Sequence, residues 1–358
     1  MFDKQATSFL EDLLITPSPT GFESKGQKIW AGYAGRVADE VQIDAYGSAC
    51  ARLNVAGAQK TLMLEAHCDE IGMIIQYIDD AGFLSINKIG GSDPAIARAK
   101  KVCIHARKGI VSGIIGNTAV HLQDRDNQKQ PAWKDLFIDI GAQNREEALE
   151  MVQVGDPVTF SDDFEFLSDD LLSGRALDNR IGGFMIAEVL RNLASRIKDL
   201  KVNVIALNAV QEEIGGFGAR MMSYRLMPDA ALVTDVTHAT DTPGINQKEH
   251  GRVKLGSGPS VTHGAGNHSG LVERIERIAT DKKLPLQHEA SGVRTGTDTD
   301  SIYYQQSGIP SALISVPLRY MHSPVEMVSM EDVQNLVTLM EETALSLDKT
   351  ETFRVLDL

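Results

Sequence analysis

The sequence has little of what secreted or membrane-spanning proteins require. Its 358 residues include only three cysteines, Cys50, Cys68 and Cys103, and this small, odd number excludes a disulfide framework and predicts a reducing compartment. Nowhere do eighteen apolar residues follow one another, and the first residues lack a basic segment followed by an apolar stretch. We therefore expect a cytoplasmic protein without a membrane partner.

Positive charge is also scarce. Lysine and arginine total 35 against 49 aspartates and glutamates, a net charge of −14 with histidine neutral. This excess of negative charge repels phosphates, so nucleic acid and anionic membranes are not expected partners. The chain also lacks a phosphate-binding loop and a nucleophile-elbow serine. It is long enough to bury a large core in two domains, or in one domain with an insertion.

Helical and strand patterns alternate in much of the chain, which predicts an α/β domain with a mostly parallel sheet and helices on both faces. Two helical patterns and three strand patterns precede residue 70. After residue 164 the alternation resumes. The expected helices there cover 178–196, 218–224, 269–282 and 330–347, and the expected strands cover 201–210, 230–235 and 312–316.

Residues 71–163 have a different pattern, in which short apolar runs alternate with turns. Closely spaced strands with glycine-rich turns predict a small β-barrel or sandwich. The α/β pattern lies on both sides of this segment. We therefore expect residues 71–163 to be a domain inserted into a discontinuous α/β domain made of residues 1–70 and 164–358.

The most informative stretch is Val204 to Gly218, where an apolar strand pattern leads directly into Glu212 and Glu213 and then into glycines. Adjacent carboxylates at the end of a buried strand repel each other and lose hydration, so they are costly unless cations lie against them. Solvated loop charge is the simpler alternative for this pair. If Glu212 and Glu213 lie against bound cations, further ligands for those cations must come from elsewhere in the chain.

Four other stretches supply such ligands. Apolar strand patterns lead into His67 and Asp69, into Asp235 and into His322, and a turn before a helical pattern carries Asp178. The carboxyl ends of parallel strands meet at one edge of a sheet, so residues distant in sequence converge there. Each residue alone is more often a satisfied histidine or a helix cap. Jointly they predict a dinuclear metal site formed by two histidines and three acidic residues of these stretches.

Six motifs span nearly the whole chain. They are Leu14-Ile-Thr-Pro-Ser-Pro-Thr-Gly21, Ala66-His-Cys-Asp-Glu-Ile-Gly-Met73, Arg175-Ala-Leu-Asp-Asn-Arg180, Gln211-Glu-Glu-Ile-Gly215, Thr234-Asp-Val-Thr-His238 and Tyr320-Met-His-Ser-Pro324. In this order they resemble the motifs of the tetrahedral aminopeptidases, a cobalt- or zinc-dependent family that includes glutamyl aminopeptidases. The resemblance implies a zinc-peptidase-like α/β fold with an inserted β-barrel or PDZ-like domain. It also implies short peptides as substrates, and dimers that assemble into a homododecamer.

The resemblance also implies a role for each site residue. His67 and Asp235 would hold one metal, Glu213 and His322 the other, and Asp178 would bridge them. Glu212 would be the general base, acting on a water between the metals, and Asp69 would orient His67. The bond between Asp178 and Asn179 tends to be cis in such enzymes.

Simple chemistry supports these roles. Imidazole and carboxylate ligands suit zinc or cobalt, and they permit manganese. Two metals close together acidify a water between them and stabilise the oxyanion formed on attack. A general base must lie near the metals without binding them, which suits Glu212. Asp69, two residues beyond His67, is expected on the same side of an extended strand and within reach of the free imidazole nitrogen.

Other signals are weaker. His238 lies close to Asp235 in sequence, although a supporting role or an ordinary loop accounts for it better than metal ligation. Gly296 to Asp300 resembles the family's active-site wall, but it is equally well a simple turn. Arg294 or Arg319 would favour acidic N-terminal side chains. His288-Glu289 begins like the helical zinc motif, but no second histidine follows in sequence. Cys68 is expected to be an ordinary buried thiol.

Two other functions stay open. A metal-dependent deacylase of amino-acid derivatives, or an endoglucanase-labelled hydrolase of the same fold, could use the same ligands. Glycoside cleavage requires two free carboxylates, whereas most acids here are committed to metals. A metal-stabilised scaffold without activity would have no need of Glu212.

Overall fold

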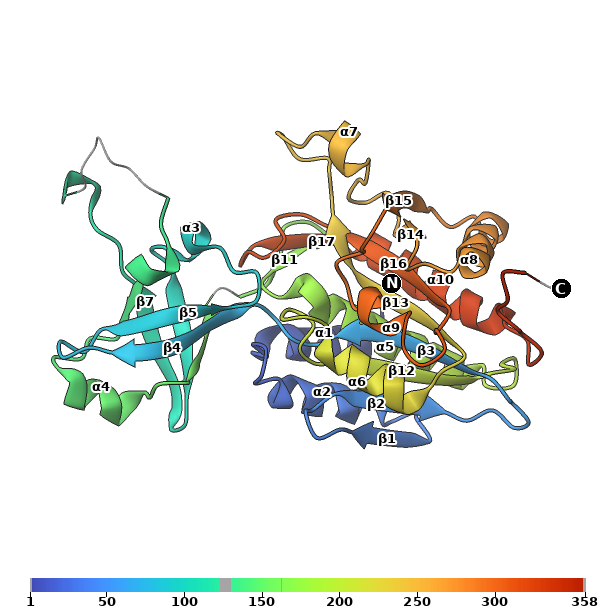
Figure 1. The fold of residues 1–358 in the computed structure, drawn as a ribbon, viewed down its shortest axis with the longest axis horizontal. Coiled ribbons are helices and arrows are strands. Elements are labelled where there is room, and N and C mark those ends of the chain that lie inside the picture. Colours follow the sequence, from blue (N-terminus) through green and yellow to red (C-terminus); the bar gives the residue numbers. More distant parts are fainter. Residues whose placement is uncertain (1, 123–129, 162, 357–358) are drawn as a thin grey trace.

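The computed structural model describes residues 2–122, 130–161 and 163–356. Figure 1 shows a large α/β body and a smaller β-barrel that projects from one side of it. The chain leaves the body after β3, forms the barrel, and returns before α5. Both parts of the expected fold class are therefore confirmed. The domain limits at residues 71 and 163 remain a prediction.

An eight-stranded sheet forms the centre of the body, in the order β1-β2-β12-β3-β13-β16-β14-β15. The four central strands β12, β3, β13 and β16 are parallel to one another. Antiparallel pairing occurs between β1 and β2, between β2 and β12, and between β16 and β14. The strands are β1 (Glu40–Ile43), β2 (Ala49–Leu53), β3 (Thr61–His67), β12 (Asn203–Ala209), β13 (Ala230–His238), β14 (Ser260–Gly264), β15 (Gln287–Ser291) and β16 (Ser311–Leu318).

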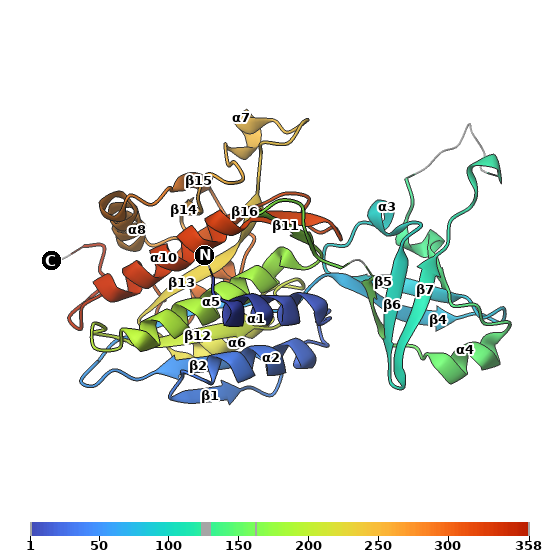
Figure 2. The same cartoon turned by 180° about the vertical axis from the view of Figure 1, so that it is seen from behind.

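Helices cover both faces of this sheet. Figure 2 shows the face covered by α1, α2, α5, α8 and α10, and Figure 1 shows α6 and α9 on the opposite face. The helices of the body are α1 (Lys4–Ile15), α2 (Ser24–Ala34), α5 (Leu177–Ser195), α6 (Phe217–Leu226), α7 (Gln247–His250), α8 (Ser269–Lys282), α9 (Thr299–Ile302) and α10 (Met330–Ser346). Strands β3, β12, β13 and β16 are buried on both faces, which explains their continuous apolar sequences.

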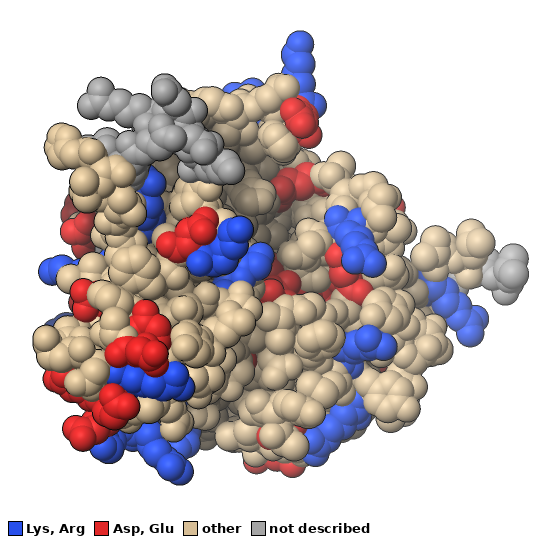
Figure 3. Space-filling model, turned by 60° about the vertical axis from the view of Figure 1, so that its left-hand side comes forward, with Lys and Arg blue, Asp and Glu red and all other residues tan. Residues whose placement is uncertain are grey.

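The barrel closes six strands in the order β4-β5-β8-β7-β6-β9. It has its own apolar core, built around Met73, Ile104 and Ile138. Its elements are β4 (Gly72–Ile78), β5 (Leu84–Ile89), α3 (Pro94–Ala97), β6 (Lys101–Ala106), β7 (Gly109–Ile115), β8 (Phe137–Asp139), α4 (Arg145–Met151) and β9 (Pro157–Phe160). Figure 3 turns the barrel side toward the viewer, where acidic and basic side chains are interspersed.

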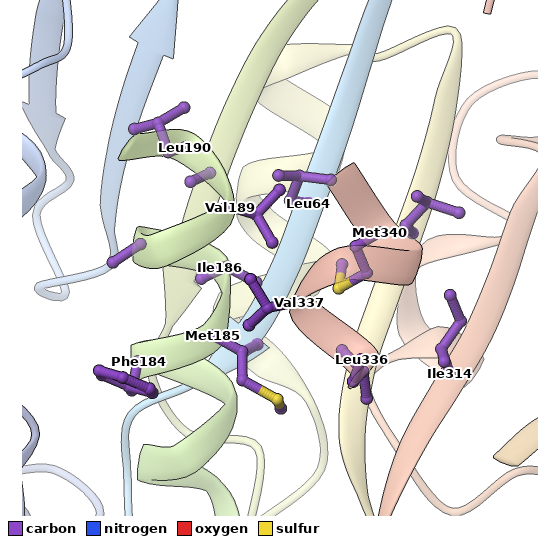
Figure 4. Close-up of a cluster of buried hydrophobic side chains, with 14 of the residues drawn as sticks. Leu64, Phe184, Met185, Ile186, Val189, Leu190, Ile314, Leu336, Val337 and Met340 are labelled. Carbon is purple, nitrogen blue, oxygen red and sulfur yellow. The ribbon is translucent and has the colours of Figure 1, made fainter. Parts of the chain in front are cut away.

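Helix α5 lies at the centre of the larger core. It packs between the sheet, α1, α2 and α10, and Figure 4 shows Met185, Ile186 and Val189 of α5 facing Val337 and Met340 of α10. Because α5 is buried on nearly all sides, its sequence is apolar well beyond one stripe. Its first turn is therefore held firmly against the ends of the central strands.

Some elements differ from the sequence-based expectation. Strands β14 and β15 were not expected, because their sequences are polar and they lie at the margin of the sheet. A small sheet in the order β10-β11-β17 was not expected either. Its strands are β10 (Glu165–Phe166), β11 (Leu171–Gly174) and β17 (Glu326–Ser329).

All three cysteines are free thiols, as expected. Cys68 is buried, and its burial raises the pKa of the thiol well above the ordinary value. Within the described residues, no helix has the length and the apolar character that crossing a membrane would require.

Glu23, just before α2, makes the stability of the fold depend on pH. Its side chain is buried and its Oε1 accepts a hydrogen bond from the backbone N–H of Gly21 at 2.8 Å. Burial raises the pKa of Glu23 from its ordinary value of 4.5 to about 7, and nearby Asp69 adds to this rise. The folded state therefore holds a proton that the unfolded chain releases between these two pH values.

We expect Glu23→Gln to remove this pH dependence. In the native protein the contribution of protonated Glu23 is fully present below pH 4.5 and is lost as pH rises through 7, a change on the order of 3 kcal/mol. Glutamine stays neutral and keeps an acceptor for Gly21. Urea unfolding at pH 4.5 and pH 8 should thus show a smaller loss of stability in the variant. Exposed Glu11→Gln is the control, and equal losses in all three proteins would contradict the assignment.

Candidate metal centre

The expected ligands converge at the carboxyl edge of the central strands. His67 is the last residue of β3, Asp235 lies within the neighbouring strand β13, and Asp178 lies in the first turn of α5. Glu212 and Glu213 follow β12, and His322 follows β16. They line a cavity of about 530 Å³, together with Val236, Thr237 and Met321. This edge is where ligand sites form in sheets of this kind.

One group of donors surrounds His67. Its Nε2 lies 3.2 Å from Oδ1 of Asp178 and 3.6 Å from Oδ1 of Asp235. All three side chains are buried, and their donor atoms lie within 4.8 Å of one another. One nitrogen and two carboxylate oxygens at this spacing suit a divalent metal such as zinc.

A second group of donors surrounds His322. Its Nε2 lies 3.3 Å from Oδ2 of Asp178 and 3.3 Å from Oε2 of Glu213. The two groups thus share Asp178, which directs one oxygen to each histidine. The other oxygen of Glu213, Oε1, is buried and has no hydrogen-bond partner within the described part of the chain. The residues therefore fit a pair of cations with a bridging carboxylate.

Asp69 links His67 to the turn that carries both glutamates. Its side chain accepts hydrogen bonds from the backbone N–H groups of Glu212 at 3.0 Å and Glu213 at 3.2 Å. Nδ1 of His67 lies 3.2 Å from the backbone oxygen of Asp69 and 3.4 Å from its carboxylate. β3 ends at His67, so this contact comes from the turn after the strand and not from strand alternation. Thr20, which the sequence did not indicate, donates to Asp69 at 2.8 Å.

Two further glutamates hold the loops around Asp178. Glu326 accepts from the backbone N–H groups of Asp178 at 3.0 Å and His322 at 2.8 Å, and so joins the two loops. Buried Glu70 pairs with Arg175 and Arg180 on either side of Asp178. The Asp178–Asn179 bond is cis, as expected. Sequence patterns did not indicate Glu326, because it acts on backbone groups and one of them, the N–H of Asp178, lies far away in the chain.

The acids of this centre are difficult to ionise together. Burial raises the pKa of Glu212 to about 10 and that of Glu213 to about 7, and neighbouring carboxylates add to both shifts. Burial opposes a charged His322, but Asp178 and Glu213 outweigh it and raise its pKa to about 11. Asp178 is the exception, because the two histidines outweigh its burial and lower its pKa. Among the residues that the structure describes, no lysine or arginine lines the cavity, so cations from solution would have to balance these acids.

Comparison with known families agrees with this geometry. A model of the M42 glutamyl aminopeptidase family matches residues 47–339. The chain belongs to this family. Membership makes it an aminopeptidase-family hydrolase, and confirms the family resemblance seen in the motifs.

Individual relatives align with the chain over almost their full length. The chain is 32% identical to a lysyl aminopeptidase of Pyrococcus furiosus, over 92% of this chain and 94% of the relative. It is 32% identical to a TET aminopeptidase of a marine-sediment Thaumarchaeota archaeon, with a TM-score of 0.92 and coverage of 98% and 99%. A TET1 peptidase of Pyrococcus horikoshii, described as forming a tetrahedron or a large octahedral shell, is 31% identical with a TM-score of 0.84 and coverage of 96% and 100%.

One similar structure has a different name. A Thermotoga maritima protein named endoglucanase is 25% identical, with a TM-score of 0.75 and coverage of 94% of this chain and 98% of that chain. Proteins named aminopeptidase and a protein named endoglucanase therefore share this fold, and the sequence analysis had kept an endoglucanase-labelled hydrolase as an alternative.

The weaker candidates fall into different places in this M42 family member. His238, Gly296 and Thr297 line the cavity with the metal-ligand candidates. Arg294 lines an adjoining hollow that also includes Glu212. Arg319 is held in an ion pair with Asp241 at 2.6 Å, so its charge is already balanced.

A larger hollow of about 900 Å³ lies near Tyr303 and the C-terminal segment and includes none of the expected ligands.

The inserted segment itself reaches the centre, which the sequence did not indicate. Gly91, in the loop after β5, lines the cavity. A Cβ at this position would lie 2.5 Å from Nδ1 and 2.7 Å from Cε1 of His322. The glycine therefore allows the backbone of the insertion to lie directly against the imidazole ring.

We expect Gly91→Ala to weaken metal binding at the His322 side of the centre. The added methyl group displaces the ring, and disturbing the groups that orient a ligand typically costs 10- to 100-fold in metal affinity. Titration with a chelator followed by metal analysis measures this loss. Gly292→Ala is a matched control, because a Cβ there meets nothing within 4 Å. Equal affinity in both variants would show that His322 does not bind metal in this position.

Proposed function

We propose that this protein is a dinuclear metallo-aminopeptidase that removes N-terminal residues from short peptides. The observation that carries the proposal is the sharing of Asp178 between two groups of donors, one with His67 and Asp235 and one with His322 and Glu213. Zinc and cobalt suit this donor set, and manganese is compatible with it. Membership in an aminopeptidase family supports the choice of reaction.

The residues divide into ligands and one general base. When bound, the two cations would acidify a water between them and polarise the substrate carbonyl. Glu212 lines the cavity, and its Oε2 is 3.9 Å from Nε2 of His67, yet it belongs to neither group of three donors. In our proposal Glu212 takes the proton of the attacking water and passes it to the leaving amine. Asp69 holds both His67 and the Glu212-Glu213 turn in place.

Hydrolysis of a substrate panel tests the proposed reaction. We expect aminoacyl-anilides with a free amino group to be cleaved, and cleavage to stop when a chelator removes the metals and to return when zinc or cobalt is added. N-acylated amino acids test the deacylase alternative, and carboxymethylcellulose tests the endoglucanase alternative. Cleavage of cellulose or of N-acyl substrates alone would overturn the aminopeptidase proposal.

We further propose a cytoplasmic homo-oligomer in which the barrel joins subunits, as a tetrahedral homododecamer. The assembly described for the Pyrococcus horikoshii peptidase supports this proposal. A closed shell would admit only short, unfolded peptides. Light scattering of the whole chain is the test, and a monomer at all concentrations would contradict it. Deletion of the barrel is a poor test, because Gly91 also lines the cavity.

A further inference from the structure

A second cluster of side chains that can bind a metal lies at the β15 margin of the eight-stranded sheet. It consists of His263 of β14, His288 of β15 and Glu276 of α8. None of these residues lines the cavity of the candidate metal centre. His288 lies on a strand and not on the helix that the helical zinc motif requires. A different histidine, His263 of the neighbouring strand, lies beside it.

The distances within this cluster match those of a tetrahedral metal site. Nε2 of His263 lies 3.1 Å from Nδ1 of His288. Oε1 of Glu276 lies 3.6 Å from the first nitrogen and 3.5 Å from the second. Zinc binds such ligands at about 2.0–2.2 Å, which places neighbouring donors of a tetrahedron about 3.3–3.6 Å apart. The three atoms thus lie close to one face of a tetrahedron.

Hydrogen bonding alone accounts for this cluster poorly. The two imidazoles can share one proton, but the carboxylate oxygen is too far from either ring for a good hydrogen bond. Among the ion pairs of the described residues, Glu276 takes part only in those with the two histidines. The side chains of His263 and His288 are 43% and 54% exposed, so an ion can reach them from solvent.

We propose that His263, Glu276 and His288 form a third zinc site, outside the candidate metal centre, with water as the fourth ligand. The ion would tie α8 to β14 and β15 at the edge of the sheet. On the opposite face of β15, Glu289 accepts a hydrogen bond from Thr237 at 2.6 Å, and Thr237 lines the candidate catalytic cavity. The zinc would therefore hold the strand that supports this wall of the cavity. Two imidazoles and one carboxylate select zinc over magnesium or calcium.

Zinc content of the full-length protein tests this site without reference to activity. After dialysis against buffered micromolar zinc, we expect His263→Ala and His288→Ala each to bind one ion fewer per chain than the native protein. His250→Ala removes an equally exposed histidine outside the cluster and should bind as many as the native protein. Equal zinc content in all four proteins would overturn the proposal. Circular dichroism confirms that each variant is folded.

Location of the ion gives a second, independent test. Crystals equilibrated with zinc should show an anomalous peak within bonding distance of all three donors, and crystals equilibrated with magnesium should show none there. A peak at the candidate catalytic centre with no density at His263 and His288 would overturn the third site alone. Loss of the catalytic peak with retention of this one would count against the proposed function alone.

Discussion

Glu212→Gln should lower kcat for aminoacyl-anilides by roughly 10²- to 10⁴-fold, the usual contribution of a general base. Glutamine has nearly the same shape as glutamate but cannot accept the proton of the attacking water. The backbone N–H of residue 212 still donates to Asp69, so the turn keeps its conformation. Because Glu212 is outside both donor groups, metal content should equal that of the native protein.

The matched control for this change is Glu213→Gln. The two residues are adjacent and have the same chemistry, but Oε2 of Glu213 lies 3.3 Å from Nε2 of His322 and belongs to a donor group. We expect this variant to lose metal as well as activity. Steady-state kinetics and metal analysis of both variants separate the two roles. Full activity in Glu212→Gln would exclude it as the base, and loss of metal from Glu212→Gln would make it a ligand.

Asp178→Asn should disturb both metal positions at once. Its two oxygens lie 3.2 Å from Nε2 of His67 and 3.3 Å from Nε2 of His322. Asparagine has similar volume but replaces one oxygen with an NH₂ group, which cannot bind a cation. We expect no more than one tightly held metal at the centre. Because metal assistance contributes several kcal/mol to the barrier, kcat/KM should fall by a factor on the order of 10³.

Asp229→Asn provides the control for the same chemical change. Asp229 forms an ion pair with Lys60 at 2.8 Å and does not line the candidate metal centre. This variant should keep its metals and its activity. Metal analysis after gel filtration, together with anilide hydrolysis, measures both variants. Retention of two catalytic metals and of the native rate in Asp178→Asn would exclude Asp178 as the bridging ligand.

Local sequence carried much of the information about the fold and about the five expected ligands. The apolar runs of β3, β12, β13 and β16 are continuous because these strands are buried on both faces. Candidate ligands stand out where such runs end, as at His67 and Glu213. The rule that parallel strands share a carboxyl edge then brings them together. The turn-rich pattern of 71–163 likewise indicated a separate β domain, which the structure shows as a closed barrel.

Contacts between distant segments were beyond the reach of sequence patterns. Strands β14 and β15 have polar sequences, and they form because β16 offers a hydrogen-bonding edge to β14, which in turn offers one to β15. Thr20 and Glu326 act on groups supplied by other loops, and a glycine such as Gly91 shows no sign of the ring it must avoid. The order of the amino acids is enough to indicate which segments are buried and which polar residues follow them, because burial and alternation are local properties. The groups that position the candidate ligands, and the meeting of His263, Glu276 and His288, come from the folded chain, because they depend on distances between segments far apart in sequence.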